Sequence, residues 1–216
     1  MAISATMVKE LREKTSAGML DCKKALTETD GDFDKAIEWL RKKGLSSAGK
    51  KAGRVAAEGL VSSYIHGEGR IGVMVEVNSE TDFVARTDKF KAFVSDIAMH
   101  IAAANPIAVN ADDVPADLVE KERHVLTLKN QEDGKKEEMI PKIVEGQINK
   151  WLKEQCLMMQ TYVKNPDLTV DQYLKETIAT IGENIVIRRF ARFELGEGIE
   201  KKEDNFAEEV AAATKG

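Results

Sequence analysis

The sequence predicts an α+β protein with a helical N-terminal module, a core of a small antiparallel sheet packed with helices, a helical hairpin and a C-terminal helix. Two changes of hydrophobic period support this class. Apolar residues recur at helical spacing up to about residue 44, alternate with a period of two over residues 60–77, and return to helical spacing after Thr87. An amphipathic helix that directly follows a β-hairpin is typical of a sheet with a helical layer.

Residues 1–45 are expected to form three short helices around a small core. Ser4 or Thr6 can cap the first helix and Asp32 the third, because short polar side chains accept the free N–H groups of a first helical turn. Gly44 is expected to end the third helix. The residues expected to face inward are Met7, Val8, Leu11, Cys22, Ala25, Leu26, Phe33, Ala36, Ile37 and Leu40. Residues 46–58, rich in small residues and cations, are expected to form a hinge or a loosely helical linker.

Residues 59–112 and 157–200 are expected to form the α+β core. Alternation on both sides of the His66–Gly69 turn predicts a β-hairpin that ends near Val77. Thr87 is expected to cap a helix with one continuous apolar stripe, made of Phe90, Phe93, Val94, Ile97 and Ile101. A further helix begins at Thr169 or Asp171 and ends at Gly182, and the strand after it should join the hairpin. On that strand Ile185 and Ile187 share one side, with Arg189 as a candidate for the same side.

Residues 113–156 are expected to form an antiparallel helical hairpin, and residues 201–216 a C-terminal helical module. Val114–Pro115 opens the first helix of the hairpin, and Asp133–Gly134 turns the chain. The expected apolar positions are Leu118, Val125 and Leu128 on the first helix and Ile140, Ile143, Val144, Ile148, Trp151 and Leu152 on the second. The last segment, with Phe206 and Val210 on one side, reads as a short acidic helix.

Charge and cysteine content exclude several classes of protein. A net charge of −5 argues against a general nucleic-acid binder, so no direct nucleic-acid partner is expected. Residues 1–54 hold twelve basic against eight acidic residues and residues 194–216 seven acidic against three basic, which indicates separate contact surfaces for a partner or a second copy. The two distant cysteines fit a reducing cytosol, and neither a signal peptide nor a membrane span is expected. The expected location is the cytoplasm.

No combination of residues predicts an enzyme. His66, His100 and His124 lie on three separate predicted elements, so each is better explained as a structural or solvated side chain. Cys22 falls on the inward face of the second helix and is better explained as a small buried residue than as a nucleophile. No catalytic residue, metal ligand or cofactor is therefore expected.

Two short segments are candidate contact sites. Thr81–Asp82–Phe83 places an acid and an aromatic side by side on a turn between a strand and a helix, which suits a wedge that enters a partner; pattern alone favours a core position for Phe83. Met19–Leu20 would form an apolar patch rimmed by Lys9, Arg12 and Lys23 if exposed, or would complete the small core if buried. Pattern alone favours neither reading of this pair.

Three motifs in this order resemble those of bacterial translation elongation factor Ts. They are Val8–Thr15 with Ala17–Met19 and Asp21–Leu26, then Thr81–Ala85, then Phe193–Lys201. This family is the guanine nucleotide exchange factor for elongation factor Tu. The resemblance implies that residues 1–45 form a ubiquitin-associated-type bundle that docks on the GTPase domain of the partner.

The resemblance also assigns roles to individual residues. Thr81, Asp82, Phe83 and Val84 correspond to a segment that intrudes beside the nucleotide and disturbs its Mg²⁺ and phosphate site. The implied docking residues are Lys9, Arg12, Met19, Leu20 and Lys23, with further contacts from His66 and from the tail helix at Phe206 and Val210. On this basis Phe83 is expected to be exposed.

The chain resembles a short form of the family, because only one strand-and-helix unit is found where longer members have two. A single unit leaves one apolar sheet face uncovered, which predicts a homodimer with two elongation factor Tu molecules bound. Two other classes are considered: an adaptor that binds a partner through the three-helix module alone, with Asp82 and Phe83 dispensable, and an enzyme that uses Cys22 or His66.

Overall fold

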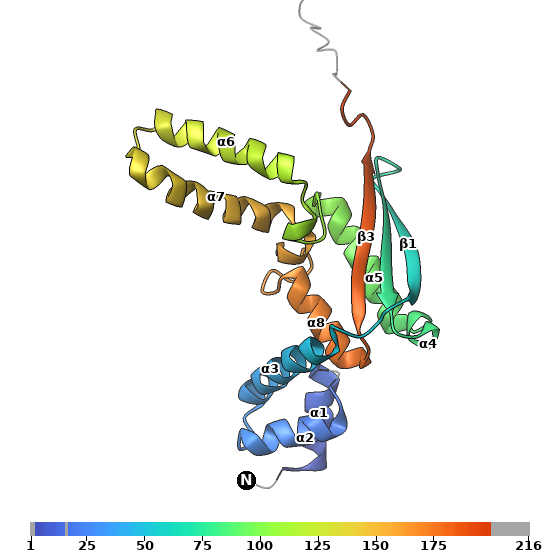
Figure 1. The fold of residues 1–216 in the computed structure, drawn as a ribbon. Helices are drawn as coiled ribbons and strands as arrows, with labels where there is room; N and C mark the ends of the chain where they lie inside the picture. Colours follow the sequence, from blue (N-terminus) through green and yellow to red (C-terminus); the bar gives the residue numbers. More distant parts are fainter. Residues whose placement is uncertain (1–2, 16, 200–216) are drawn as a thin grey trace, which may run out of the picture.

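The computed structural model describes residues 3–15 and 17–199, so the expected tail helix with Phe206 and Val210 lies outside the described residues. Within these ranges the fold is mixed α+β, with one three-stranded antiparallel sheet that has helices on one face and beyond its ends (Figure 1). The helices are α1 (Ala5–Thr15), α2 (Met19–Glu28), α3 (Phe33–Lys51), α4 (Asp82–Ala85), α5 (Asp88–Ala104), α6 (Ala116–Glu132), α7 (Ile140–Gln155) and α8 (Val170–Ile181). The strands are β1 (Glu58–His66), β2 (Ile71–Ser79) and β3 (Ile185–Glu194).

The N-terminal module has the predicted three helices and a core of its own. The Ser4 hydroxyl accepts a hydrogen bond from Met7 N at 3.2 Å, and the Asp32 carboxylate accepts one from Lys35 N at 3.1 Å, so both predicted caps are present. Its buried residues are Val8, Leu11, Cys22, Ala25, Leu26, Ala36 and Leu40. The helical spacing of these positions therefore predicted the core of the module.

The prediction that Gly44 ends the third helix is wrong, because α3 continues to Lys51. Gly44 lies where α3 crosses α8, and a Cβ placed on it would lie 3.1 Å from Ala179 Cβ. The glycine therefore allows a close approach of two helices instead of a helix end. Beyond it, Ala48 is buried in the main core, and Arg41 Nε lies 3.1 Å from a Glu176 carboxylate oxygen. Packing against α8 extends the helix through the first part of the expected linker.

The sheet has the order β1-β2-β3, and both neighbouring pairs are antiparallel, as predicted. The turn between β1 and β2 contains Gly67, Glu68 and Gly69, all with positive φ, and closes with a hydrogen bond from Arg70 N to His66 O at 3.1 Å. Between β2 and β3 the register shifts at Glu76/Val77.

Because of this shift, the predicted position of Arg189 on the same side of β3 as Ile185 and Ile187 is wrong. The two isoleucines are buried, but the additional residue of a bulge reverses the alternation of side chains further along β3. Arg189 lies opposite Glu76 and donates from Nε to its carboxylate at 2.6 Å. Arg188 binds the other oxygen of the same carboxylate at 2.7 Å, and the two guanidinium groups lower the pKa of Glu76 to about 2.

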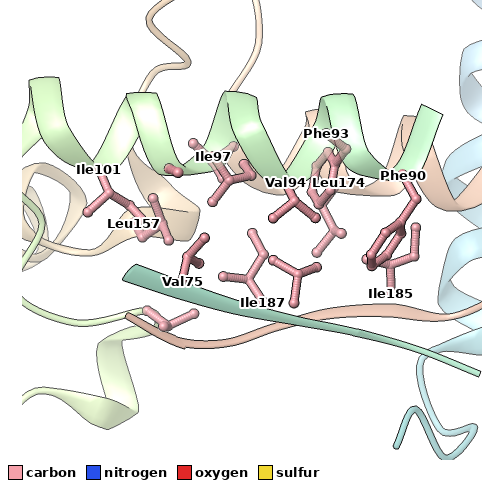
Figure 2. Packing of buried hydrophobic residues seen from close by; sticks show 14 of the residues in the cluster. Val75, Phe90, Phe93, Val94, Ile97, Ile101, Leu157, Leu174, Ile185 and Ile187 are labelled. Atoms are coloured by element: carbon pink, nitrogen blue, oxygen red, sulfur yellow. The ribbon is translucent and has the colours of Figure 1, made fainter. Parts of the chain in front are cut away.

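The main core lies between the sheet and α5, with α8 beside it. Figure 2 shows the predicted stripe of α5 pointing toward β2 and β3. Thr87 caps this helix by accepting a hydrogen bond from Phe90 N at 3.3 Å. The buried residues of this core include Val75, Phe90, Phe93, Val94, Ile97, Ile101, Leu157, Leu174, Ile185 and Ile187. The other face of the sheet is covered by no helix among residues 3–15 and 17–199.

Helices α6 and α7 form the predicted hairpin, which extends away from the sheet in Figure 1. The apolar face predicted for α6 is wrong, since Leu118, Val125 and Leu128 are exposed. Val119 and Leu126 instead pack against the buried residues of α7, which are Ile140, Val144 and Ile148. Positions 118 and 125 and positions 119 and 126 are both seven residues apart, so spacing alone does not separate the two faces.

A buried histidine ties α5 to the loop that precedes α8. His100 is fully buried, its Nε2 lies 3.0 Å from Gln160 Oε1, and Val163 N donates to its Nδ1 at 3.3 Å. The imidazole is therefore neutral, with its proton on Nε2 and Nδ1 free to accept. Protonation would place a donor at Nδ1 opposite the Val163 N–H, and burial lowers the pKa of His100 below its usual 6.5.

The free energy of unfolding is expected to decrease as the pH falls below about 6.5. The unfolded chain binds the His100 proton at a higher pH than the folded chain, so this stabilisation is complete above the unfolded pKa and is lost as the pH falls toward the folded pKa. Urea unfolding at about pH 7.5 and about pH 5.5 measures the change. His100→Gln should show a smaller change, whereas His124→Gln on α6 should match the parent. Equal changes in the parent and His100→Gln would contradict the role of His100, and an NMR titration of the imidazole provides the same test in the parent protein.

Candidate partner-binding site

A short turn after β2 presents Asp82 and Phe83 to solvent. Thr81 is the N-cap of α4, and its Oγ1 accepts a hydrogen bond from Val84 N at 3.4 Å. The Ser79 hydroxyl donates to Thr81 O at 2.9 Å and closes the segment before the cap. Phe83 is 76% exposed, so the core position that pattern alone favoured is wrong and the exposure implied by the resemblance is confirmed. We call residues 81–83 the wedge turn.

The two flanking residues show how the wedge turn is attached. Val84 is half-buried and packs against the main core, and Ala85 is buried. Asp82 pairs with Arg86 one helical turn later, with its carboxylate 2.7 Å from Nη2. Surface ion pairs of this kind contribute about 0–1 kcal/mol. The Asp82 carboxylate can therefore exchange Arg86 for a partner group at little cost, while Val84 and Ala85 keep the backbone on the core.

A second segment, far away in the sequence, supports the wedge turn. The Glu183 carboxylate accepts hydrogen bonds from Thr81 N at 3.0 Å and from Thr81 Oγ1 at 2.8 Å. Next to it, Asn184 N donates to Glu80 Oε1 at 2.6 Å, and Asn184 Nδ2 donates to Arg54 O at 2.8 Å. Sequence reasoning did not find Glu183, because it lies 102 positions from Thr81 and no local pattern links the two.

The N-terminal module presents an exposed apolar pair at the start of α2. Met19 is 50% exposed and Leu20 is 82% exposed, so the alternative that they complete the core of the module is wrong. They open α2 directly after Gly18. Lys23 lies one turn after Met19 on α2 and is exposed.

Two further cations lie on α1. Lys9 and Arg12 are exposed and three residues apart, which places them on one side of that helix. Lys9 lies 3.9 Å from Glu13, an exposed pair that a partner can displace. We call Lys9, Arg12, Met19, Leu20 and Lys23 the N-terminal patch. In Figure 1 the N-terminal module and α4 lie at the same end of the sheet, and the α6–α7 hairpin extends from the other end.

The remaining candidate residues do not meet in one site. His66 is exposed at the end of β1, where its Nδ1 lies 3.1 Å from the Tyr64 hydroxyl oxygen, while His100 is buried in the core. Cys22 and Cys156 are both buried, and burial raises the pKa of the Cys156 thiol. Within the described ranges, no group of three or more histidine, cysteine or acidic residues is placed to hold a metal ion. In the same part of the chain, no helix is long and apolar enough to cross a membrane.

Known proteins with similar sequences show to which family this chain belongs. Residues 48–197 match the family described as Elongation factor TS. The protein named Elongation factor Ts in Geobacter sulfurreducens is 63% identical over 213 residues, 99% of both chains. The protein of the same name in Alkaliphilus metalliredigens is 63% identical over 211 residues, 98% of both chains. The one in Acetivibrio thermocellus is 59% identical over 214 residues, 99% of this chain and 100% of the relative. The chain is thus a factor of translation elongation. It belongs to the elongation factor Ts family.

Proposed function

We propose that this chain is a guanine nucleotide exchange factor for elongation factor Tu. It binds the GDP form, disturbs the Mg²⁺ and phosphate site, releases GDP and stabilises the nucleotide-free state until GTP binds. The observation that carries this proposal is the exposed Phe83 beside the half-exposed Asp82, held on a tethered turn in a chain of the elongation factor Ts family. Such a pair combines a negative charge with a large apolar side chain at one point of the surface.

The chemistry of nucleotide binding explains why such a pair would release GDP. GTPases hold the phosphates largely through Mg²⁺ and through backbone N–H donors. A carboxylate brought close to this site alters the environment of the metal ion, and an aromatic ring that enters an apolar pocket can displace the elements that carry the donors. By linkage, a factor that binds the nucleotide-free state more tightly than the GDP state must weaken GDP binding by the same ratio.

The other surfaces would hold the partner in place. The N-terminal patch, on a module of the ubiquitin-associated type, docks on the GTPase domain, and its apolar pair supplies most of the contact energy. His66 and the tail residues Phe206 and Val210 add further contacts. No covalent bond is made or broken by this chain, so the proposed activity is exchange without enzymatic chemistry and without a cofactor of its own. The factor acts in the cytoplasm, where elongation takes place.

Release of a fluorescent GDP analogue from elongation factor Tu tests the proposal. Coupling of this kind weakens GDP binding by up to about 100-fold, and with an unchanged association rate the intact chain at saturating concentration should accelerate release by the same factor. No acceleration would overturn the proposal. The alternative is an adaptor that binds through residues 1–45 alone. It would bind the partner without changing the rate of release, and it would not depend on Asp82 or Phe83.

We also propose that two copies of the chain pair through the uncovered face of the sheet. This face carries five exposed apolar side chains, Val61, Ile65, Met74, Val186 and Phe193. They come from all three strands. Exposed apolar side chains on an uncovered sheet face are typical of an interface, and a second copy would bury them against an identical face.

The protein is expected to sediment as a dimer at about 10 µM, and Met74→Glu is expected to convert it to a monomer. Met74 lies on the central strand, so a symmetric interface would bring two new carboxylates into an apolar contact, at a cost of several kcal/mol. Val125→Glu on exposed α6 is the matched control and should remain a dimer. A monomer for the unmodified chain would contradict this part of the proposal.

A further inference from the structure

We propose that Glu183 is a positioning residue for nucleotide exchange: its carboxylate fixes the direction in which Asp82 and Phe83 leave the surface. This inference rests on the proposed exchange function and adds to it a residue outside the wedge turn. Glu183 acts through Thr81 and is not required to touch the partner.

The two hydrogen bonds to Thr81 determine both its position and its orientation. One oxygen of the carboxylate accepts from the backbone N–H at 3.0 Å and the other from the hydroxyl at 2.8 Å. Two parallel bonds to an ionised acceptor are stronger than neutral bonds and restrict rotation as well as distance. The hydroxyl that donates to Glu183 also accepts from Val84 N at 3.4 Å. Glu183 thereby orients the oxygen that caps α4, the helix on which Asp82 and Phe83 lie.

Glu183 is itself held by the structure around it. Gly182, with a φ of 94°, ends α8 and turns the chain into Glu183. On the other side Asn184 is fixed by its bonds to Glu80 and Arg54. The next residue, Ile185, is buried in the main core. The carboxylate therefore belongs to a segment fixed at both ends and can act as a support for a less stable neighbour.

The wedge turn requires such a support. Helix α4 has only four residues, and a helix of that length has no stability of its own. The Phe83 ring is mostly exposed and so contributes little packing that would hold the turn. Without support, the wedge turn would adopt several orientations in the free protein. Ordering it on entry into the partner would then use part of the binding energy. Loss of the support should therefore lower the maximal rate of exchange, while docking through the N-terminal patch stays the same.

The test measures GDP release from elongation factor Tu at increasing concentrations of the intact chain and of its variants. Glu183→Ala is expected to lower the maximal rate about tenfold, the effect of losing hydrogen bonds to a charged group, without changing the half-saturating concentration. Glu183→Gln keeps one acceptor oxygen and should recover part of the rate. Glu145→Ala is the matched control, since it removes a surface carboxylate that binds Arg123 at 2.8 Å on the hairpin, and it should behave as the parent.

A double-mutant cycle with Thr81→Val shows whether Glu183 acts through Thr81. Thr81→Val removes the hydroxyl bond to Glu183 and the cap on Val84 N but keeps the backbone N–H bond to Glu183. Because the two changes share the hydroxyl bond, the double variant should lose less activity than the product of the two single losses. Independent, multiplying effects would overturn the inference, as would a change confined to the half-saturating concentration. If the parent and Glu183→Ala accelerate release equally well, this inference alone is refuted. A parent without acceleration would refute the proposed function itself. If circular dichroism shows that Glu183→Ala does not fold, Glu183→Gln takes its place. In that case the inference would be refuted if Glu183→Gln and Thr81→Val both release GDP at the maximal rate of the parent.

Discussion

Replacing both Asp82 and Phe83 by alanine is expected to remove most of the acceleration of GDP release, a loss on the order of 100-fold in the maximal rate. The double change takes away the charge that would act near the metal ion and the ring that would fill an apolar pocket. Docking through the N-terminal patch remains, so the variant should still bind elongation factor Tu. Single variants separate the two contributions: Asp82→Ala removes only the charge and Phe83→Ala only the apolar contact.

This loss should occur in a protein that stays folded. Phe83 is mostly exposed, and the Asp82 carboxylate pairs with Arg86 at the surface, so the free energy of unfolding should change by less than about 1 kcal/mol. Urea unfolding of the variant and the parent measures this directly. Val125→Ala, which shortens an exposed apolar side chain on α6, is the control and should leave release unchanged. Parent-like release by the double variant would contradict the wedge and favour the adaptor alternative.

Replacing Met19 and Leu20 by alanine is expected to raise the half-saturating concentration about 30-fold and to leave the maximal rate unchanged. A loss of about 1 kcal/mol for each of the two contacts would give a combined effect of about this size. Because both residues are outside the core of the N-terminal module, its stability should be unaffected. A titration of release against the concentration of the variant separates affinity from maximal rate.

The control for this pair is Leu118→Ala with Leu128→Ala, two exposed apolar residues on the hairpin. This variant removes a similar apolar area and should titrate as the parent does. A Met19 and Leu20 variant with a lower maximal rate at saturation and an unchanged half-saturating concentration would show that the pair acts on release and does not serve docking.

The sequence predicted those parts of the fold that depend on neighbouring residues. The caps at Ser4, Asp32 and Thr87 follow from short polar side chains placed before apolar periodicity, and each makes its expected hydrogen bond. The stripe of α5 follows from five apolar residues at helical spacing, and all of them are buried. Local rules were sufficient in these cases because no distant contact opposes them.

The predictions that failed depend on contacts between distant segments. Gly44 resembles a helix end, but close packing on Ala179 continues the helix past it. The bulge that turns Arg189 outward is set by pairing with β2 and leaves no sign in β3 itself. The exposure of Phe83 could not be deduced from apolar spacing, because an aromatic residue after a strand is usually buried; the resemblance of its motif supplied the correct expectation.

The length of α3 has a consequence for how a partner is selected. This helix has 19 residues and so spans about 28 Å, and it runs from the N-terminal module into the packing on α8 without a flexible joint at Gly44. The spacing between the N-terminal patch and the wedge turn, the two proposed contact surfaces, is therefore set by a rigid helix and not by a random coil. A partner whose two receptor sites match that spacing meets the second surface at a high effective concentration once the first is bound. A protein with one matching site gains no such advantage, so the fixed length of α3 favours partners that have two sites at the matching distance.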